Sequence, residues 1–150
     1  MNVPSASKPA AASTAILSLG SNLPPREAHL AAARAALDAL PGTRLVRASR
    51  ILETEPVDVP DEFAHLKFLN QVVLVETTLE VHDFSRRMHA IEDDLGRVRT
   101  VRNGPRTIDL DLIAFDDLTL EEPDLILPHP RARQRAFVME PLAELGVTLS

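Results

Sequence analysis

The sequence contains no cysteine, no tryptophan and no tyrosine. Without cysteine there is no disulfide framework, no thiolate metal site and no cysteine nucleophile. RNA-binding modules stack bases on the aromatic side chains of a sheet, so the missing aromatics and the net charge of −6 argue against a nucleic-acid partner. No apolar run approaches the roughly 20 residues that cross a bilayer, so no membrane association is expected.

Lysine is also scarce, because the sequence has two lysines and 14 arginines. Half of the arginines fall between Arg97 and Arg135, although the chain as a whole is acidic. This uneven distribution predicts a local anion-binding site on an acidic body.

The first 13 residues are rich in alanine, serine and proline and lack the continuous apolar segment of a signal peptide. We therefore expect a disordered tail at 1–13 and a single domain at 14–150, since a chain of this length can build one core. The expected location is the cytoplasm, and the expected state is a monomer or weak homodimer.

The pattern of apolar residues predicts an α+β fold, a ferredoxin-like βαββαβ sandwich with an antiparallel sheet, helices on one face and a C-terminal strand/helix appendage. A helix is expected to open at Pro24-Pro25 and to end before Pro41-Gly42, and a second, strongly amphipathic helix spans 80–95. The expected strands are 15–19, 44–52, 68–77 and 107–115, followed by a short strand at 118–120 and a last helix near 137–145. Two long loops, 53–67 and 96–106, are expected to act as lids.

The stretch from Arg97 to Phe115 organises the rest of the chain. Four arginines lie within ten residues, and an alternating strand follows that places Asp109 and Asp111 on one face. Guanidinium groups bind phosphate oxygens bidentately, and paired carboxylates hold Mg²⁺ together with phosphates and water. The combination indicates a polyphosphate–metal site, although a strand with acidic residues on its solvent face is also common.

Three other segments carry candidate ligand contacts, each with an ordinary structural alternative. Phe68 and Asn70 share one face of a strand and could hold a flat heterocycle, or they could be a core aromatic beside a turn amide. His129 lies between two prolines and could donate to a phosphate, or it could be a surface histidine. Gly20-Ser21-Asn22 is a strand-to-helix turn and not a P-loop, because no Gly-Lys-Ser/Thr follows it.

Together these segments resemble the 6-hydroxymethyl-7,8-dihydropterin pyrophosphokinase family, over residues 15 to about 146. Five motifs carry the resemblance in the same order as in the family, and the fourth is the most specific. They are Leu19-Gly20-Ser21-Asn22, Thr54-Glu55-Pro56, Phe68-Leu69-Asn70, Gly104-Pro105-Arg106-Thr107-Ile108-Asp109-Leu110-Asp111, and Pro128-His129-Pro130 with Arg135-Ala136-Phe137.

The resemblance implies an enzyme of folate synthesis that transfers pyrophosphate from ATP to the pterin hydroxymethyl group, with two Mg²⁺ ions and AMP as the product. It implies metal ligation by Asp109 and Asp111, and catalytic roles for these two residues with Arg97 and Arg106. The implied ATP-binding residues are Glu92, Arg97, Arg99, Arg102, Arg106, His129 and Arg135. The implied pterin-binding residues are Thr54, Glu55, Val57, Phe68, Asn70 and Phe137.

The sequence departs from the family pattern at a few positions. Asn103 stands where some members have tryptophan, in an arginine loop that is one residue shorter and has no lysine. Pro130 stands where some members have tyrosine, and Asp58 where glycine is usual. These departures concern loop closure more than chemistry. The competing functions are a non-catalytic ferredoxin-like ligand-binding module, an RNA-binding module, and a phosphotransferase that forms ADP.

Overall fold

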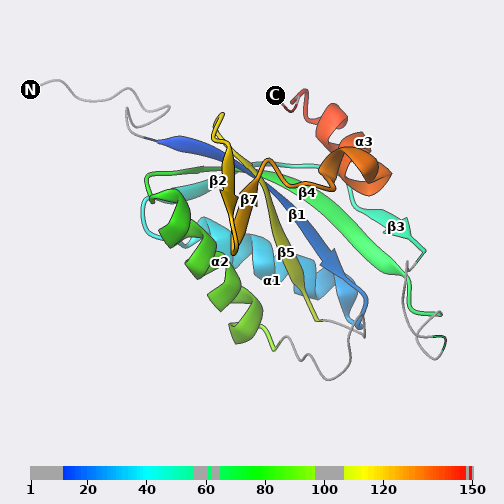
Figure 1. Cartoon of the computed structure of the whole chain (residues 1–150). Helices are drawn as coiled ribbons and strands as arrows, with labels where there is room; N and C mark the ends of the chain where they lie inside the picture. The colour runs from blue at the N-terminus through cyan, green and yellow to red at the C-terminus, as the bar shows by residue number, and fades with distance from the viewer. Residues whose placement is uncertain (1–11, 56–60, 62–64, 97–106, 148, 150) are drawn as a thin grey trace, which may run out of the picture.

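The computed structural model describes residues 12–55, 61, 65–96, 107–147 and 149. Their elements form one antiparallel sheet, one small hairpin, three α-helices and a short 3-10 helix (Figure 1). In chain order these are β1 (Ser13–Ser21), α1 (Arg26–Asp38), β2 (Thr43–Ala48), β3 (Leu52–Thr54), β4 (Phe68–Thr77), α2 (Val81–Asp94), β5 (Asp109–Phe115), β6 (Leu120–Glu122), β7 (Leu125–Leu127), η2 (Ala132–Gln134) and α3 (Ala136–Glu144).

The sheet has the order β2-β4-β1-β5, and all of its pairs are antiparallel. The mixed α and β content and the antiparallel sheet are therefore confirmed. The expectation of one continuous strand over 44–52 was wrong, because β2 and β3 are separate strands that both pair with β4. The break lies at Ser49, whose N–H donates to Val72 O (2.9 Å) and whose hydroxyl oxygen accepts from Val72 N–H (3.0 Å). A side chain thus takes the place of a backbone partner at this point of the ladder.

The helices α1 and α2 cover one face of the sheet and enclose the larger core (Figure 1). Both predicted apolar stripes are buried there, including Leu30 and Leu37 of α1 and Met88 of α2. Phe84 is fully buried, and its ring centroid lies 5.9 Å from that of Phe115 on β5. This packing holds α2 beside the strand that carries the two aspartates.

The third helix, α3, lies on the opposite face of the sheet (Figure 1). The sequence predicted a last helix near 137–145 but placed the helices on one face only. Val138 and Leu142 of α3 pack in a second cluster with Ile16, Val72 and Ile113. Pro141 lies inside this helix and is buried, so it neither breaks the helix nor faces solvent. The second face is therefore partly covered, and side chains at the other ends of its strands remain available.

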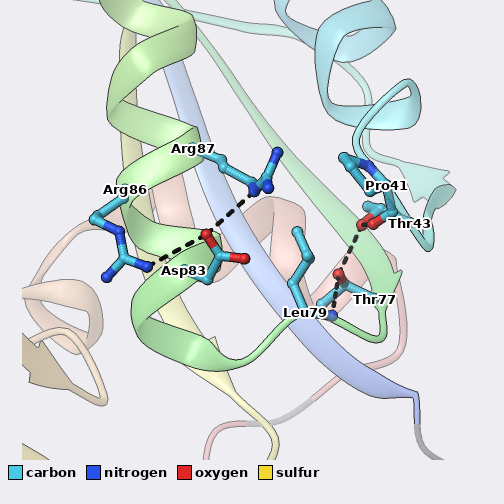
Figure 2. Close-up of polar contacts among 7 residues, drawn as sticks. All are labelled: Pro41, Thr43, Thr77, Leu79, Asp83, Arg86 and Arg87. Carbon is cyan, nitrogen blue, oxygen red and sulfur yellow. Dashed lines mark hydrogen bonds and ion pairs between the residues drawn. The ribbon is translucent and has the colours of Figure 1, made fainter.

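Hydroxyl groups join the two turns at one end of the sheet (Figure 2). Leu79 N–H donates to Thr77 Oγ1 (3.1 Å), the Thr77 and Thr43 hydroxyls are 2.7 Å apart, and Thr43 donates to Pro41 O (2.8 Å). Since Thr43 donates to Pro41, Thr77 must donate to Thr43. Each of the two threonine hydroxyls therefore both donates and accepts one hydrogen bond. The turn after α1 is thereby tied to the turn after β4.

The solvent side of α2 carries charge pairs. Asp83 accepts from Arg86 (3.4 Å) and from Arg87 (3.2 Å), as Figure 2 shows. Exposed pairs at this spacing contribute only about 0.3–0.5 kcal/mol each, so the position of α2 depends on its buried side.

The segment after β5 forms a hairpin of β6 and β7, with Pro123-Asp124 in the turn. The single short strand expected at 118–120 was therefore misplaced and incomplete. His129 N–H donates to Ile113 O (2.8 Å), which holds the segment after the hairpin against β5. Within the part of the chain that the structure describes, no helix combines the length and hydrophobicity needed to cross a membrane.

His82 at the start of α2 is connected to this hairpin. Its Nδ1 lies 2.7 Å from Glu80 Oε2, and its Nε2 lies 2.8 Å from Glu122 Oε1 on β6. The hydrogen bonds to Glu80 and Glu122 raise the pKa of His82 above its ordinary value, and the bond to His82 lowers the pKa of Glu80.

We expect this contact to stabilise the fold in acid more than in base. A folded-state pKa raised above the unfolded value contributes stability that is complete below about pH 6.5 and is lost as the pH rises through the raised pKa. Urea unfolding of the wild type and of His82→Gln at pH 5.5 and 8.5 should therefore give a larger difference in free energy of unfolding at pH 5.5. An equal difference at both pH values would show that His82 does not bridge the two carboxylates when charged.

Candidate active site

The two aspartates of β5 share one face of the sheet, as the alternation in the sequence predicted. Ile108, Leu110 and Leu112 are buried against α1 and α2, whereas Asp109 and Asp111 point to the α3 face. The side chain of Asp111 is 46% exposed, so it is accessible to a ligand.

Gly20 of β1 lies between Asn70 and Asp109 in the sheet. It is the registered partner of Asn70 on β4 and of Asp109 on β5, so the three residues form one row across three strands. Registered partners project to the same face, and the glycine leaves the middle of the row without a side chain. A Cβ atom at Gly20 would lie 3.4 Å from Asn70 Oδ1 and 3.6 Å from Phe68 Cδ1. We call this row the floor: it has an amide and an aromatic ring on one side of Gly20 and a carboxylate on the other.

Asn70 is held in one orientation by Thr54. Its Nδ2 donates to Thr54 Oγ1 (2.6 Å), and the amide is 5% exposed. Thr54 is the registered partner of Phe68, so β3 and β4 bring three of the predicted pterin-binding residues together. Glu55 does not join them, because its side chain is 74% exposed and lies 3.3 Å from Lys67 Nζ.

The segment before α3 brings Arg135 to the aspartates. Arg135 Nη1 lies 4.0 Å from Asp111 Oδ2, and its guanidinium carbon lies 5.5 Å from the centroid of the Phe137 ring. A guanidinium over a ring face is stabilised by the ring quadrupole. The arrangement places one permanent positive charge and one half-buried ring next to Asp111.

His129 lies in the same neighbourhood, and its pKa is lowered from the ordinary value, which favours the neutral ring. Burial lowers its pKa, and so do the charges of Arg135 and Arg131, although Asp111 acts in the opposite direction. Its Nδ1 accepts from Arg131 N–H (3.1 Å), so the neutral ring carries its proton on Nε2. The imidazole can therefore donate one hydrogen bond to an anion without first becoming charged.

A cavity of about 250 Å³ opens beside Asp111. It lies between α2, β5 and the β6–β7 turn, and His129 and Asp111 belong to its wall. Ser85 and His89 of α2 and Ile126 of β7 complete the part of the wall that the sequence had not indicated. The turn residues Pro123 and Asp124 were the signal that could have located it, because they mark a hairpin that must fold back over β5.

Glu92 is buried between α2 and β5, and it is 3% exposed. Its Oε2 accepts from the backbone N–H of Leu110 (2.7 Å), and its Oε1 lies 2.9 Å from His89 Nδ1. The neighbouring His89 lines the cavity, so Glu92 lies close to it without forming part of the wall. A direct contact between Glu92 and a nucleotide stays a prediction.

Several predicted site residues lie outside the described part of the chain. They are Val57, Arg97, Arg99, Arg102 and Arg106. The two expected lids, 53–67 and 96–106, fall largely in the same gaps, so their roles stay predictions.

The described donor set suits a hard divalent cation. Asp109 and Asp111 offer carboxylate oxygens, which Mg²⁺ prefers, and they leave coordination positions for phosphates and water. Over the described residues, no group of three or more His, Cys, Asp or Glu side chains could hold a metal. A cation at this strand could take further ligands from water and from substrate phosphates.

Comparison with known proteins decides the family. The family model of 7,8-dihydro-6-hydroxymethylpterin-pyrophosphokinase (HPPK) matches residues 16–147, which is most of the chain. The chain belongs to the HPPK family. Among similar proteins, the 2-amino-4-hydroxy-6-hydroxymethyldihydropteridine pyrophosphokinase of Bacillus subtilis is 41% identical over 131 residues, covering 87% of this chain and 77% of that protein. The protein of the same name from Methylorubrum extorquens is 42% identical over 135 residues, covering 90% and 84%.

Solved structures agree with the HPPK fold. An HPPK-DHPS from Plasmodium falciparum with pterin and p-hydroxybenzoate superposes with a TM-score of 0.66 at 15% identity, covering 91% of this chain. This chain spans 38% of that longer protein. An HPPK-DHPS in complex with substrates gives the same TM-score, and this chain spans 40% of it.

Proposed function

We propose that this HPPK-family chain transfers the pyrophosphoryl group of ATP to the hydroxymethyl group of 6-hydroxymethyl-7,8-dihydropterin, with AMP as the second product, in folate biosynthesis. The observation that carries the proposal is the position of Asp109 and Asp111. They lie between the floor at Gly20 and the cavity beside α2. Two substrates bound on either side would meet at the carboxylates.

The pterin is assigned to the floor. A planar heterocycle would lie next to Gly20, which has no side chain of its own, with the Phe68 ring and the Asn70 amide beside it. Asn70, oriented by Thr54, can exchange paired hydrogen bonds with the edge of the ring. Phe137 is assigned to the same ligand from the α3 side, because Arg135 connects it to Asp111.

ATP is assigned to the cavity and to the positive groups next to it. The nucleoside would occupy the space between α2 and the hairpin, and the triphosphate would extend toward Asp111. His129 Nε2–H and the Arg135 guanidinium are both placed to donate to phosphate oxygens. The arginines of 97–106 are assigned to the remaining oxygens, as the sequence predicted.

The metal assigned to Asp109 and Asp111 is Mg²⁺, two ions in all. When bound, Mg²⁺ would neutralise phosphate oxygens and stabilise charge on the attacking and leaving oxygens. The two carboxylates would hold the ions, and Arg135 would meet the negative charge that develops on the phosphate oxygens.

In the reaction, the pterin hydroxyl oxygen forms a bond to the β-phosphorus, and the bond from that phosphorus to the α,β-bridging oxygen breaks. The hydroxyl proton passes to solvent, and AMP leaves. Transfers of this kind depend almost entirely on positioning and charge stabilisation. The chain supplies both without a protein nucleophile.

We assign the fold itself to the ferredoxin-like class. The strand order β2-β4-β1-β5, with α1 and α2 on one face, supports this assignment. The β6–β7 hairpin and α3 are additions that form walls of the two proposed binding sites.

Product analysis tests the proposal. The protein is mixed with ATP, Mg²⁺ and the pterin, and the nucleotide products are separated. AMP formed only when the pterin is present is the expected result. ADP would instead indicate a different phosphotransferase, and no turnover by a folded protein would indicate a non-catalytic binding module.

A further inference from the structure

The buried carboxylate of Glu92 connects α2 to the strand that carries the two aspartates. Glu92 is 3% exposed, and its Oε2 accepts from the backbone N–H of Leu110 at 2.7 Å. Leu110 lies directly between Asp109 and Asp111 in the sequence. A carboxyl group this deeply buried needs hydrogen-bond partners, and the Leu110 N–H supplies one at short distance.

The position of β5 explains why this bond matters. In the sheet order β2-β4-β1-β5, β5 pairs with β1 on one side only. Successive N–H groups along a strand point to opposite sides, so the N–H of Leu110, which meets Glu92, faces away from β1. At the centre of the aspartate pair, the strand is thus held by β1 on one side and by a side chain of α2 on the other.

We propose that Glu92 is a positioning residue for the divalent-cation site. By holding Leu110 N–H, its carboxylate sets the path of β5 and therefore the orientation of Asp109 and Asp111. The inference rests on the proposed function, in which those two residues bind Mg²⁺. It differs from a direct nucleotide contact, because the effect of Glu92 passes through the backbone of Leu110.

Two conservative substitutions separate the effect of side-chain length at Glu92 from the effect of its charge. Glu92→Gln keeps the length of the side chain, so its amide oxygen can accept from Leu110 N–H while its NH₂ donates to His89 Nδ1. Glu92→Asp keeps the charge but withdraws the carboxylate by about one C–C bond, ~1.5 Å. Positioning predicts a functional Gln variant and an impaired Asp variant, whereas an electrostatic contact with metal or nucleotide predicts the reverse.

The affinity for Mn²⁺ is measured in the presence of α,β-methylene-ATP. The readout is the electron paramagnetic resonance signal of free Mn²⁺. For Glu92→Asp we expect binding weaker by about 10–100-fold, the usual effect of losing a residue that orients a metal ligand. For Glu92→Gln we expect a change of less than about threefold, because the hydrogen bond is kept. The apparent Mn²⁺ requirement of AMP formation should change in the same order.

A matched control separates positioning from general loss of stability. Leu37→Val lies on α1 and loosens the core on the same side of the sheet, but leaves α2 and the hydrogen bond from Leu110 N–H to Glu92 untouched. It should lower the thermal midpoint without changing Mn²⁺ affinity. Weaker Mn²⁺ binding in Leu37→Val, an impaired Gln variant or an unimpaired Asp variant would each overturn the proposal. Failure of the wild type to form AMP would instead overturn the proposed function.

Discussion

Replacing Asp111 with alanine should lower the rate of AMP formation by about 10²–10³-fold, the usual cost of removing one preorganised electrostatic group. Asp111 is expected to have the larger role of the two aspartates, because it lies beside both Arg135 and the cavity. The measurement is kcat under saturating ATP, pterin and Mg²⁺, with the thermal midpoint recorded for each variant. The fold should persist, since the side chain is 46% exposed.

The matched control for this prediction is Asp94→Ala, which removes an exposed carboxylate at the end of α2. Its rate should equal that of the wild type. If Asp111→Ala retained more than about a tenth of the wild-type rate, the loss would be too small for a metal ligand. The metal site would then have to be assigned to other residues.

Gly20→Val should lower kcat/KM for the pterin by about 10²-fold, chiefly by raising KM, because displacing a substrate by about 1 Å is enough for such a loss. The valine methyl groups would occupy the floor between Asn70 and Asp109. Binding of the ATP analogue should be unaffected, since the cavity is lined by other residues. Steady-state kinetics with each substrate varied in turn would measure both effects.

The smaller substitution, Gly20→Ala, should not weaken the fold. A Cβ at Gly20 would make ordinary contacts, the closest at 3.4 Å. Glycine within a strand costs roughly 0.5–1 kcal/mol relative to alanine. Unfolding in urea should therefore show equal or greater stability. Gly20→Ala, with one carbon instead of three, should give an intermediate KM; an unchanged KM in both variants would remove the pterin from this floor.

The parts of the fold that follow local periodicity could be predicted from the sequence. The alternation in β5 gave the aspartate face, and the stripe of α2 gave its buried side. The interruption at Ser49 could not be predicted in this way, because it depends on hydrogen bonds to Val72 in another strand. Neither could α3 be assigned to the second face, since apolar spacing shows that a helix has a buried side but not which sheet face receives it.

The pairing register between strands that are distant in the sequence limited the prediction of the site in the same way. Phe68 and Asn70 could be placed on one face of their strand, but the floor also needs Gly20 as the registered partner of Asn70. The position of Glu92 in the sequence indicated a buried role, but the resemblance to the family assigned it to a nucleotide contact. Glu92 lies four residues after Met88 on the apolar side of α2, where a charged residue needs a buried partner.

The two outer edges of the sheet also bear on solubility. An edge strand with unpaired backbone groups is a template for another chain, and natural sheets block such edges. On β5, Leu110 N–H is engaged by Glu92 and Ile113 O by His129 N–H. On the opposite edge, β2 and β3 have six and three residues and are interrupted at Ser49. Among the described strands, neither edge presents a long unpaired ladder, so the contacts that shape the site also disfavour pairing with a second sheet.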